Sequence, residues 1–388
     1  MNNIEKILVF ATVIAPFTLL RFGFIGFGEL SILFLFIYSL QKGYLDGISK
    51  KMIFSSFWSK FIVVSLFGFA YNVIVLGYNG RVLGDSLFDL LAYLMLFISC
   101  FLVENLHKKG LINSYLILRH VFLYSGIAFG FLYVVSQFTP SIFGLPIKYY
   151  HYFAPFVKNI HQTAMIMTPL SFLGLFLVSN EKSKFIKLIF LVLILMFSFI
   201  ATETGSFKAF LAVVICWVVF IVIKILKILP RELKNLAKGF IIILTLFFII
   251  NNLQKVEMTV IEVFTENDGN NARSNLYRIA IDTGFLSPVF GLGPGPQLDY
   301  MKGGLSDAHQ TFLTVFLQAG IIGIILFVVL VFKILKYLSK DSASLVFFIA
   351  IFIYLAGGDI LRRLPIWLLL LFFYYYIESQ SKNELIKK

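Results

Sequence analysis

The chain has 388 residues, of which 59% are hydrophobic and only 14% are charged, and its mean hydropathy is +0.91. A soluble protein of this length needs far fewer apolar residues to fill its core, so most of the chain must face lipid or other buried helices. The net charge of +13 does not indicate a nucleic-acid partner, because the basic residues are scattered through short loops between apolar runs and form no single basic face.

Apolar runs of roughly 20 residues recur along the whole chain and predict about twelve transmembrane helices. In the first half we expect them at 6–22, 24–40, 61–76, 87–103, 115–136 and 162–179. In the second half we expect them at 188–201, 208–229, 239–254, 309–332, 344–357 and 365–378. No small-residue cleavage site follows the first run, so it is predicted as a retained helix. The predicted fold is an all-α, polytopic membrane bundle forming one integral membrane domain over residues 1–388.

Lysine and arginine are unevenly divided between the two sides of this topology. With the N-terminus placed in the cytoplasm, 21 of the 33 fall in cytoplasmic segments and 11 in outside segments, and Arg119 lies within a span. Short cytoplasmic loops of membrane proteins are enriched in both residue types. The distribution therefore predicts that both termini are cytoplasmic and that the one long polar loop, residues 254–308, lies outside the cytoplasm.

No motif in the chain points to a metal or a cofactor. Cys100 and Cys216 both fall inside predicted spans, which offers neither metal-ligand spacing nor a disulfide framework. P-loop, zinc and nucleophile-elbow patterns are absent from the sequence. Gly291 to Gly295 follows a G-x-G-x-G pattern, but no strand is predicted before it.

Within the long loop, an amphipathic helix is expected around Arg273 to Thr283, followed by Pro288 and by Gly291, Gly293 and Gly295. Glycines at this density bring backbone N–H groups within reach of a ligand, although a plain re-entrant or surface loop would have the same composition.

Two arginines of this expected helix are candidates for binding an anion. Arg273 and Arg278 are five residues apart, so a helix splays them by roughly 140°, and both reach one anion only at the helix end or between helix and membrane. The planar, permanently charged guanidinium suits phosphate oxygens. Anchoring to lipid headgroups is the alternative interpretation.

His309 opens the next predicted span, with Ser306 or Asp307 expected as its N-cap. A neutral imidazole there could accept the proton of a sugar hydroxyl, whereas a histidine placed at the interface for solvation is the simpler alternative. Several of the other polar residues near this side could converge on a cavity between helices; they are Arg21, Arg81, Asp85, His151, Lys158, His161, Glu203, Lys208, Asp359, Arg362 and Arg363. Glu29 and Asp89 lie within or near span ends, where an ionisable side chain is costly unless it snorkels or faces a polar cavity.

Several stretches resemble the O-antigen polymerase and ligase superfamily. The family pattern is an arginine, an aromatic residue, a proline leading into G-x-G-x-G, then His-Asn-x-x-Leu and G-x-x-G. The matching stretches here are Arg273-Ser-Asn-Leu-Tyr-Arg278, Pro288 to Gly295, and His309-Gln-Thr-Phe-Leu with Gly320-Ile-Ile-Gly323. Gln310 replaces the usual asparagine after the histidine.

Two further segments are similar to family motifs. The segment Thr204 to Leu211 resembles a Gly-Ser-Arg-Gly-Ala-Leu stretch, with Phe207 at the usual arginine position and Lys208 beside it. His161-Gln-Thr-Ala164 lies where members often carry Asn-x-x-Ala.

The resemblance implies a GT-C-like helix bundle that performs a metal-independent, inverting glycosyl transfer on the periplasmic face. The implied donor is a glycan carried on undecaprenyl pyrophosphate. By this resemblance His309 takes the proton from the acceptor hydroxyl and Arg273 holds the departing pyrophosphate. Further contacts to pyrophosphate or glycan are expected from Arg278, Lys208, Gly291, Gly293, Gly295 and His161.

Within the family we favour a polymerase that extends repeat units on the lipid carrier, and the alternative is a ligase that moves finished polymer to lipid A core. A lipid-linked oligosaccharide flippase or a solute transporter is the alternative of another class, but such proteins usually show two related halves. The expected partners are the lipid bilayer, the lipid-linked oligosaccharides, and a chain-length regulator and flippase of the same pathway. The expected location is the bacterial inner membrane.

Overall fold

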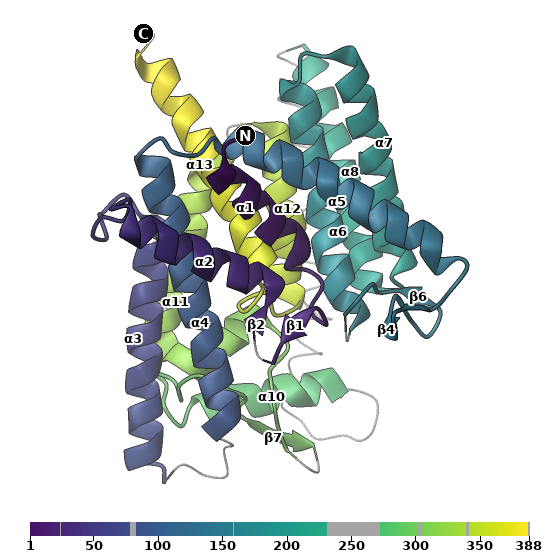
Figure 1. Ribbon diagram of the computed structural model, residues 1–388. Helices are drawn as coiled ribbons and strands as arrows, with labels where there is room; N and C mark the ends of the chain where they lie inside the picture. The colour runs from purple at the N-terminus through teal and green to yellow at the C-terminus, as the bar shows by residue number, and fades with distance from the viewer. Residues whose placement is uncertain are drawn as a thin grey trace.

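The computed structural model describes residues 1–23, 25–77, 83–157, 159–230, 272–301, 304–338 and 341–386. The predicted span 239–254 lies outside the described residues, as do 254–271 and 302–303 of the long loop. Within the described ranges the chain folds mainly into helices (Figure 1). The helices of the first half are α1 (Asn3–Ile14), α2 (Phe27–Gln41), α3 (Ile53–Ile74), α4 (Leu83–Lys108), α5 (Ser114–Ser136) and α6 (Ile160–Asn180). Those of the second half are α7 (Lys184–Glu203), α8 (Phe207–Ile228), α10 (Ala272–Gly284), α11 (Thr311–Leu338), α12 (Ser342–Gly357) and α13 (Leu364–Ile386).

Four short antiparallel hairpins connect some of these helices. They are β1 (Arg21–Phe22) with β2 (Ile25–Gly26), β3 (Ser141–Ile142) with β4 (Leu145–Pro146), β5 (Lys148–Tyr149) with β6 (Tyr152–Phe153), and β7 (Leu298–Met301) with β8 (Gly304–Ser306). The hairpins and α10 gather toward one end of the bundle, which we call the hairpin end, and both chain termini lie at the opposite, terminal end (Figure 1).

Side-chain contacts at the terminal end join the connectors that the sequence places on one side. Asp46 pairs with Lys108 and Lys109, each at 3.1 Å. Arg119 pairs with Glu181, and Lys227 Nζ donates to Ser342 Oγ at 3.2 Å. These contacts agree with the alternating path that the Lys and Arg distribution predicted.

Seven helices of the described part are long and apolar enough to cross a membrane, namely α3 to α8 and α11. The apolar helices α2 and α12 are shorter. A polytopic, all-α membrane protein is therefore confirmed at this coarser level, and the count of about twelve spans stays a prediction.

The first helix is shorter than predicted. A span was expected over 6–22, but α1 ends at Ile14, and the hairpin β1–β2 follows. Pro16 has no N–H to donate to the carbonyl of Thr12, so the helical hydrogen bonds stop there. At 1.5 Å per residue the 12 residues of α1 cover about 18 Å, less than the roughly 30 Å of a hydrocarbon core.

The core of the bundle is built around α6. Its side chains are buried without interruption from Thr163 to Leu177, so this helix is apolar on every side and enclosed by its neighbours. Gly174 lets α7 and α5 approach closely, since a Cβ there would lie 2.4 Å from Ile194 and 2.6 Å from Phe122.

Helix α11 is broken at Gly320, whose φ of 60° and ψ of −157° are not helical. A Cβ at Gly320 would lie 2.3 Å from the carbonyl oxygen of Val289, and such backbone angles belong essentially to glycine. The break lets the chain from Pro288 onward bond to α11, through Ile321 N–H to Pro288 O at 2.8 Å and Leu292 N–H to Leu317 O at 2.7 Å. The glycine-rich segment is therefore fastened against the kink.

Candidate active site

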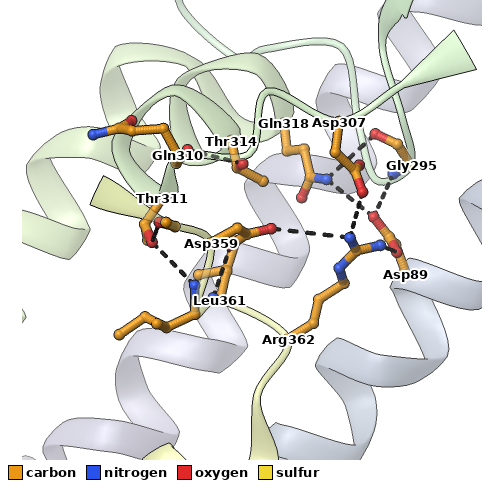
Figure 2. A network of polar contacts seen from close by, with 12 residues as sticks. Asp89, Gly295, Asp307, Gln310, Thr311, Thr314, Gln318, Asp359, Leu361 and Arg362 are labelled. Carbon is orange, nitrogen blue, oxygen red and sulfur yellow. Dashed lines mark hydrogen bonds and ion pairs between the residues drawn. The ribbon is translucent and has the colours of Figure 1, made fainter. Parts of the chain in front are cut away.

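An ion cluster at the hairpin end joins segments that are far apart in the sequence (Figure 2). Its centre is Arg362, in the connection between α12 and α13. The guanidinium pairs with Asp89 of α4 through Nη1 and with Asp307 through Nη2, and Asp359 lies 3.9 Å from Nη2. Burial by itself would lower the pKa of Arg362, but the three carboxylates hold it well above its usual value.

The buried Asp89 carboxylate also holds the glycine-rich segment. Its Oδ2 accepts from the Gly295 N–H at 3.2 Å and from Gln318 Nε2 at 3.1 Å (Figure 2). Gln318 in turn accepts from the hydroxyl of Tyr93. A buried carboxylate is costly unless it is paired and hydrogen-bonded, and Asp89 meets both conditions. The cluster thus fixes the glycine-rich segment and the α12–α13 connection to α4.

The three predicted glycines lie in this fastened segment, buried and with positive φ. Gly291 N–H donates to Ser287 O, Gly293 N–H to Gln318 O, and Gly295 N–H to Asp89. A Cβ at Gly293 would lie 2.5 Å from Phe69 of α3. Close helix packing accounts for these glycines, and their contact with phosphate stays a prediction.

His309 precedes α11, is exposed, and has a φ of 52°, which is uncommon for a residue other than glycine. Asp307, one of the two residues expected to cap the helix, does not do so. The N-cap side chain is Gln310, whose Oε1 accepts from Leu313 N–H at 2.6 Å, whereas Asp307 is held by Arg362. The position where the family carries an asparagine is thus occupied by an amide that begins the helix.

The starts of α8 and α11 both meet the end of α12. Gln310 Nε2 donates to Ala356 O at 3.1 Å, and the side chain of Lys208 lies beside Gly357, where a Cβ would be 3.5 Å from Lys208 Cε. Phe207 is 74% exposed, so of the two candidates for the family's arginine position it is Lys208 that faces the His309 region.

His161 lies near the start of α8. It opens α6, and its Nδ1 lies 3.1 Å from Ser206 Oγ, two residues before Lys208. The structure therefore brings His161, Lys208 and His309 to the ends of α6, α8, α11 and α12 at the hairpin end.

The two arginines of α10 lie on a helix that packs over the start of α11. Leu276 and Ala280 of α10 contact Ala308 and Leu317. Arg278 is half-buried and forms no ion pair with the residues that the structure describes. Arg273 lies in the first turn of α10, and its side chain lies outside the described part, so its place relative to His309 stays a prediction.

A cavity of about 520 Å³ lies on the other side of the α12–α13 connection. Arg21, Glu29, Arg362 and Arg363 are its charged lining residues, which confirms that several ionisable residues of this side converge on a cavity. Sequence reasoning named these residues but did not assign them to a site, because an ionisable residue near a span end is by itself compatible with simple solvation.

Comparison with known proteins places part of the chain in a family. No curated protein matches the chain. Residues 189–328 match the family described as O-antigen ligase, a segment that includes Lys208, α10, the glycine-rich segment and His309. This match confirms the resemblance predicted from the sequence motifs: residues 189–328 are similar to the O-antigen polymerase and ligase superfamily.

Proposed function

We propose that the chain is a polysaccharide polymerase that joins oligosaccharide repeat units carried on undecaprenyl pyrophosphate. The observation that carries the proposal is the meeting of Lys208 and the His309 segment at the end of α12, at one end of a membrane bundle. The two residues belong to the matched segment. A histidine beside a cation supplies a proton acceptor together with a group that binds phosphate.

In the proposed reaction, a hydroxyl of the acceptor glycan attacks the anomeric carbon of the donor. The bond from this carbon to the pyrophosphate oxygen breaks, and undecaprenyl pyrophosphate leaves with the electron pair. His309 takes the hydroxyl proton, and the configuration at the anomeric carbon inverts. Lys208, with Arg273 and Arg278 of α10, stabilises the negative charge that develops on the leaving group.

Because the donor already carries a good leaving group, the protein needs mainly to position two glycans and to stabilise charge. We further propose that the hairpin end faces the periplasm of a bacterial inner membrane. The excess of Lys and Arg in the connectors at the terminal end supports this orientation. A flippase that delivers repeat units and a chain-length regulator are the proposed partners.

A ligase that transfers finished polymer to lipid A core is the second candidate, favoured by the description of the matched family. The two activities share the donor and the leaving group, and they differ in the acceptor.

The test is the glycan ladder of cells that carry His309→Ala in place of the original chain. We expect single repeat units on the lipid carrier and no long chains, because the proton acceptor is lost. His151→Ala is the matched control, since His151 is an exposed histidine of the β5–β6 hairpin and has no part in the proposed chemistry. Its ladder should remain normal.

Two other outcomes would contradict the polymerase. Long polymer that accumulates on the lipid carrier without transfer would support the ligase. A normal ladder from His309→Ala would exclude both enzymes and favour a flippase or a transporter.

A further inference from the structure

The cavity behind the α12–α13 connection has one cationic end and long apolar walls. It lies between the end of α1, the start of α2, the first half of α4, and the starts of α6 and α13. Its volume of about 520 Å³ falls within the range of small-molecule sites. All of these helix ends lie at the hairpin end (Figure 1).

The apolar walls run along two helices. Leu91, Met95 and Ile98 follow one face of α4, and Ile25 and Leu33 border β2 and α2 opposite them. Leu91, which lines the cavity, is 45% exposed. An apolar chain in the cavity can therefore lie along this face of α4.

The charged end of the cavity holds three arginines that differ in their ion pairs. Arg362 is engaged by Asp89, Asp307 and Asp359, whereas Arg21 and Arg363 form no ion pair with any described residue. Glu29 is the one carboxylate among the lining residues. Arg363 is half-buried and Arg21 is exposed, and a guanidinium group without an ion pair suits an anionic ligand, above all phosphate oxygens.

Burial also lowers the pKa of Arg363, an effect that Asp359 partly offsets and the neighbouring Arg362 increases. An anion in the cavity would relieve this unfavourable environment. The required ligand thus has an anionic head and an apolar tail.

The cavity and the candidate active site share one wall. Arg362 lines the cavity and holds Asp307, which lies two residues before His309. Gln162 lines the cavity, while the adjacent His161 contacts Ser206 on the Lys208 side. Two cationic sites therefore lie on either side of the α12–α13 connection and the start of α6.

We propose that this cavity binds the diphosphate and the first isoprenoid units of the acceptor substrate, an inference that rests on the proposed polymerase function. A polymerase handles two lipid-linked glycans. The donor's pyrophosphate is the leaving group and must lie beside Lys208 and His309. The acceptor's pyrophosphate does not react and lies apart from the attacking hydroxyl, so it needs a site of its own near the same membrane surface.

The first experiment is photolabelling of the purified full chain in phosphatidylcholine vesicles with a benzophenone-bearing farnesyl diphosphate. We expect labelled peptides from α2 and the first half of α4. Labelling should fall about tenfold in Arg21→Gln/Arg363→Gln, and Lys182→Gln/Lys184→Gln at the terminal end, where both lysines are exposed, is the charge-matched control. Undecaprenyl diphosphate should compete, and inorganic pyrophosphate and phosphatidylglycerol should not.

A second variant tests the cavity without a change of charge. Ala92→Trp adds bulk to the lining, and Leu87→Trp places the same side chain on an outward-facing position of α4, 52% exposed and not part of the lining. Only the first should reduce labelling of α4. With a lipid-linked acceptor, both Arg363→Gln and Ala92→Trp should raise KM for the acceptor while kcat and KM for the donor stay unchanged.

Several results would overturn the inference. Labelling that avoids α2 and α4, or that is unaffected by both variants, would exclude the site. Equal competition by phosphatidylglycerol would make it a site for ordinary phospholipid, and equal competition by inorganic pyrophosphate would show that the apolar walls contribute nothing. A normal ladder from His309→Ala would refute the polymerase separately, because the labelling assay does not depend on transfer.

Discussion

Two buried carboxylates, one at each end of the bundle, differ in what surrounds them. At the terminal end Glu104 of α4 accepts from the N–H groups of Phe54 and Ser55 at 3.0 and 2.9 Å and from the hydroxyl of Tyr375 at 2.6 Å. At the hairpin end Asp89, fifteen residues earlier on the same helix, pairs with Arg362. Within the described part of the chain, Glu104 accepts hydrogen bonds only from uncharged groups, two of them at the start of α3. Asp89 belongs to an ion cluster that borders a cavity.

The difference between Glu104 and Asp89 shows that a buried ionisable residue does not by itself mark a functional site. Glu104 satisfies the otherwise unpaired N–H groups at the start of α3, which is a structural task. Asp89 positions Arg362 and the glycine-rich segment beside His309 and beside the cavity. We therefore expect substitutions at the two ends to separate stability from activity.

The largest effect is expected from Asp89→Ala. It removes one partner of a buried ion pair and leaves Nη1 of Arg362 and the Gly295 N–H without their acceptor, although Asp307 still pairs with Nη2, and we expect a loss of about 3 kcal/mol of stability. Transfer activity per folded molecule should also fall, because the cluster orients both sites. Thermal unfolding in detergent and a transfer assay would check this. An unchanged unfolding midpoint for Asp89→Ala would contradict the claim that the ion cluster stabilises the hairpin end.

Gly320→Ala should cause the second largest loss of stability. The added Cβ would lie 2.3 Å from Val289 O, and the backbone angles are unfavourable for alanine, which together cost about 3 kcal/mol. The glycine-rich segment would shift from α11, so activity should fall with stability. Gly47→Ala is the control, since a Cβ there meets nothing within 4 Å. Equal midpoints for the two variants would show that the kink is not required.

Glu104→Ala tests whether Glu104 contributes to stability alone. The start of α3 loses its acceptor, and we expect about 1–3 kcal/mol of destabilisation. Transfer measured per folded molecule should be unchanged, because no described contact joins Glu104 to the hairpin end. A loss of specific activity larger than the loss of folded protein would refute this separation.

The smallest effect is expected from Asp46→Asn. Hydrogen bonds from Lys109 and Lys108 lower the pKa of Asp46, so its contribution is present above the carboxylate's ordinary pKa and is lost as the pH falls through the lowered value. The group is exposed and screened by solvent, so the unfolding midpoint at neutral pH should not change measurably. A clear shift would show that the connectors of the terminal end depend on charge.

Much of the fold followed from hydropathy alone. Predicted spans such as 115–136 and 162–179 lie within a residue or two of α5 and α6. The exceptions have local causes: α1 stops before Pro16, and α11 is broken at Gly320 because the glycine-rich segment packs against it. Of the predicted site, His161, Lys208 and His309 lie at neighbouring helix ends, and the three glycines pack closely against α3, α4 and α11.

The sequence alone determined that this protein is a bundle of membrane helices and that most Lys and Arg residues lie in the connectors of one side. Hydropathy and charge are local properties, so each segment can be assigned without knowledge of its tertiary contacts. The matched motifs were readable for the same reason. Tertiary structure decided which ionisable residues meet. Asp89 and Arg362 are 273 residues apart, and their pairing depends on how α4, α11 and α13 pack, which no single segment encodes. The cavity beside Arg363 exists only because α2, α4, α6 and α13 leave room between them.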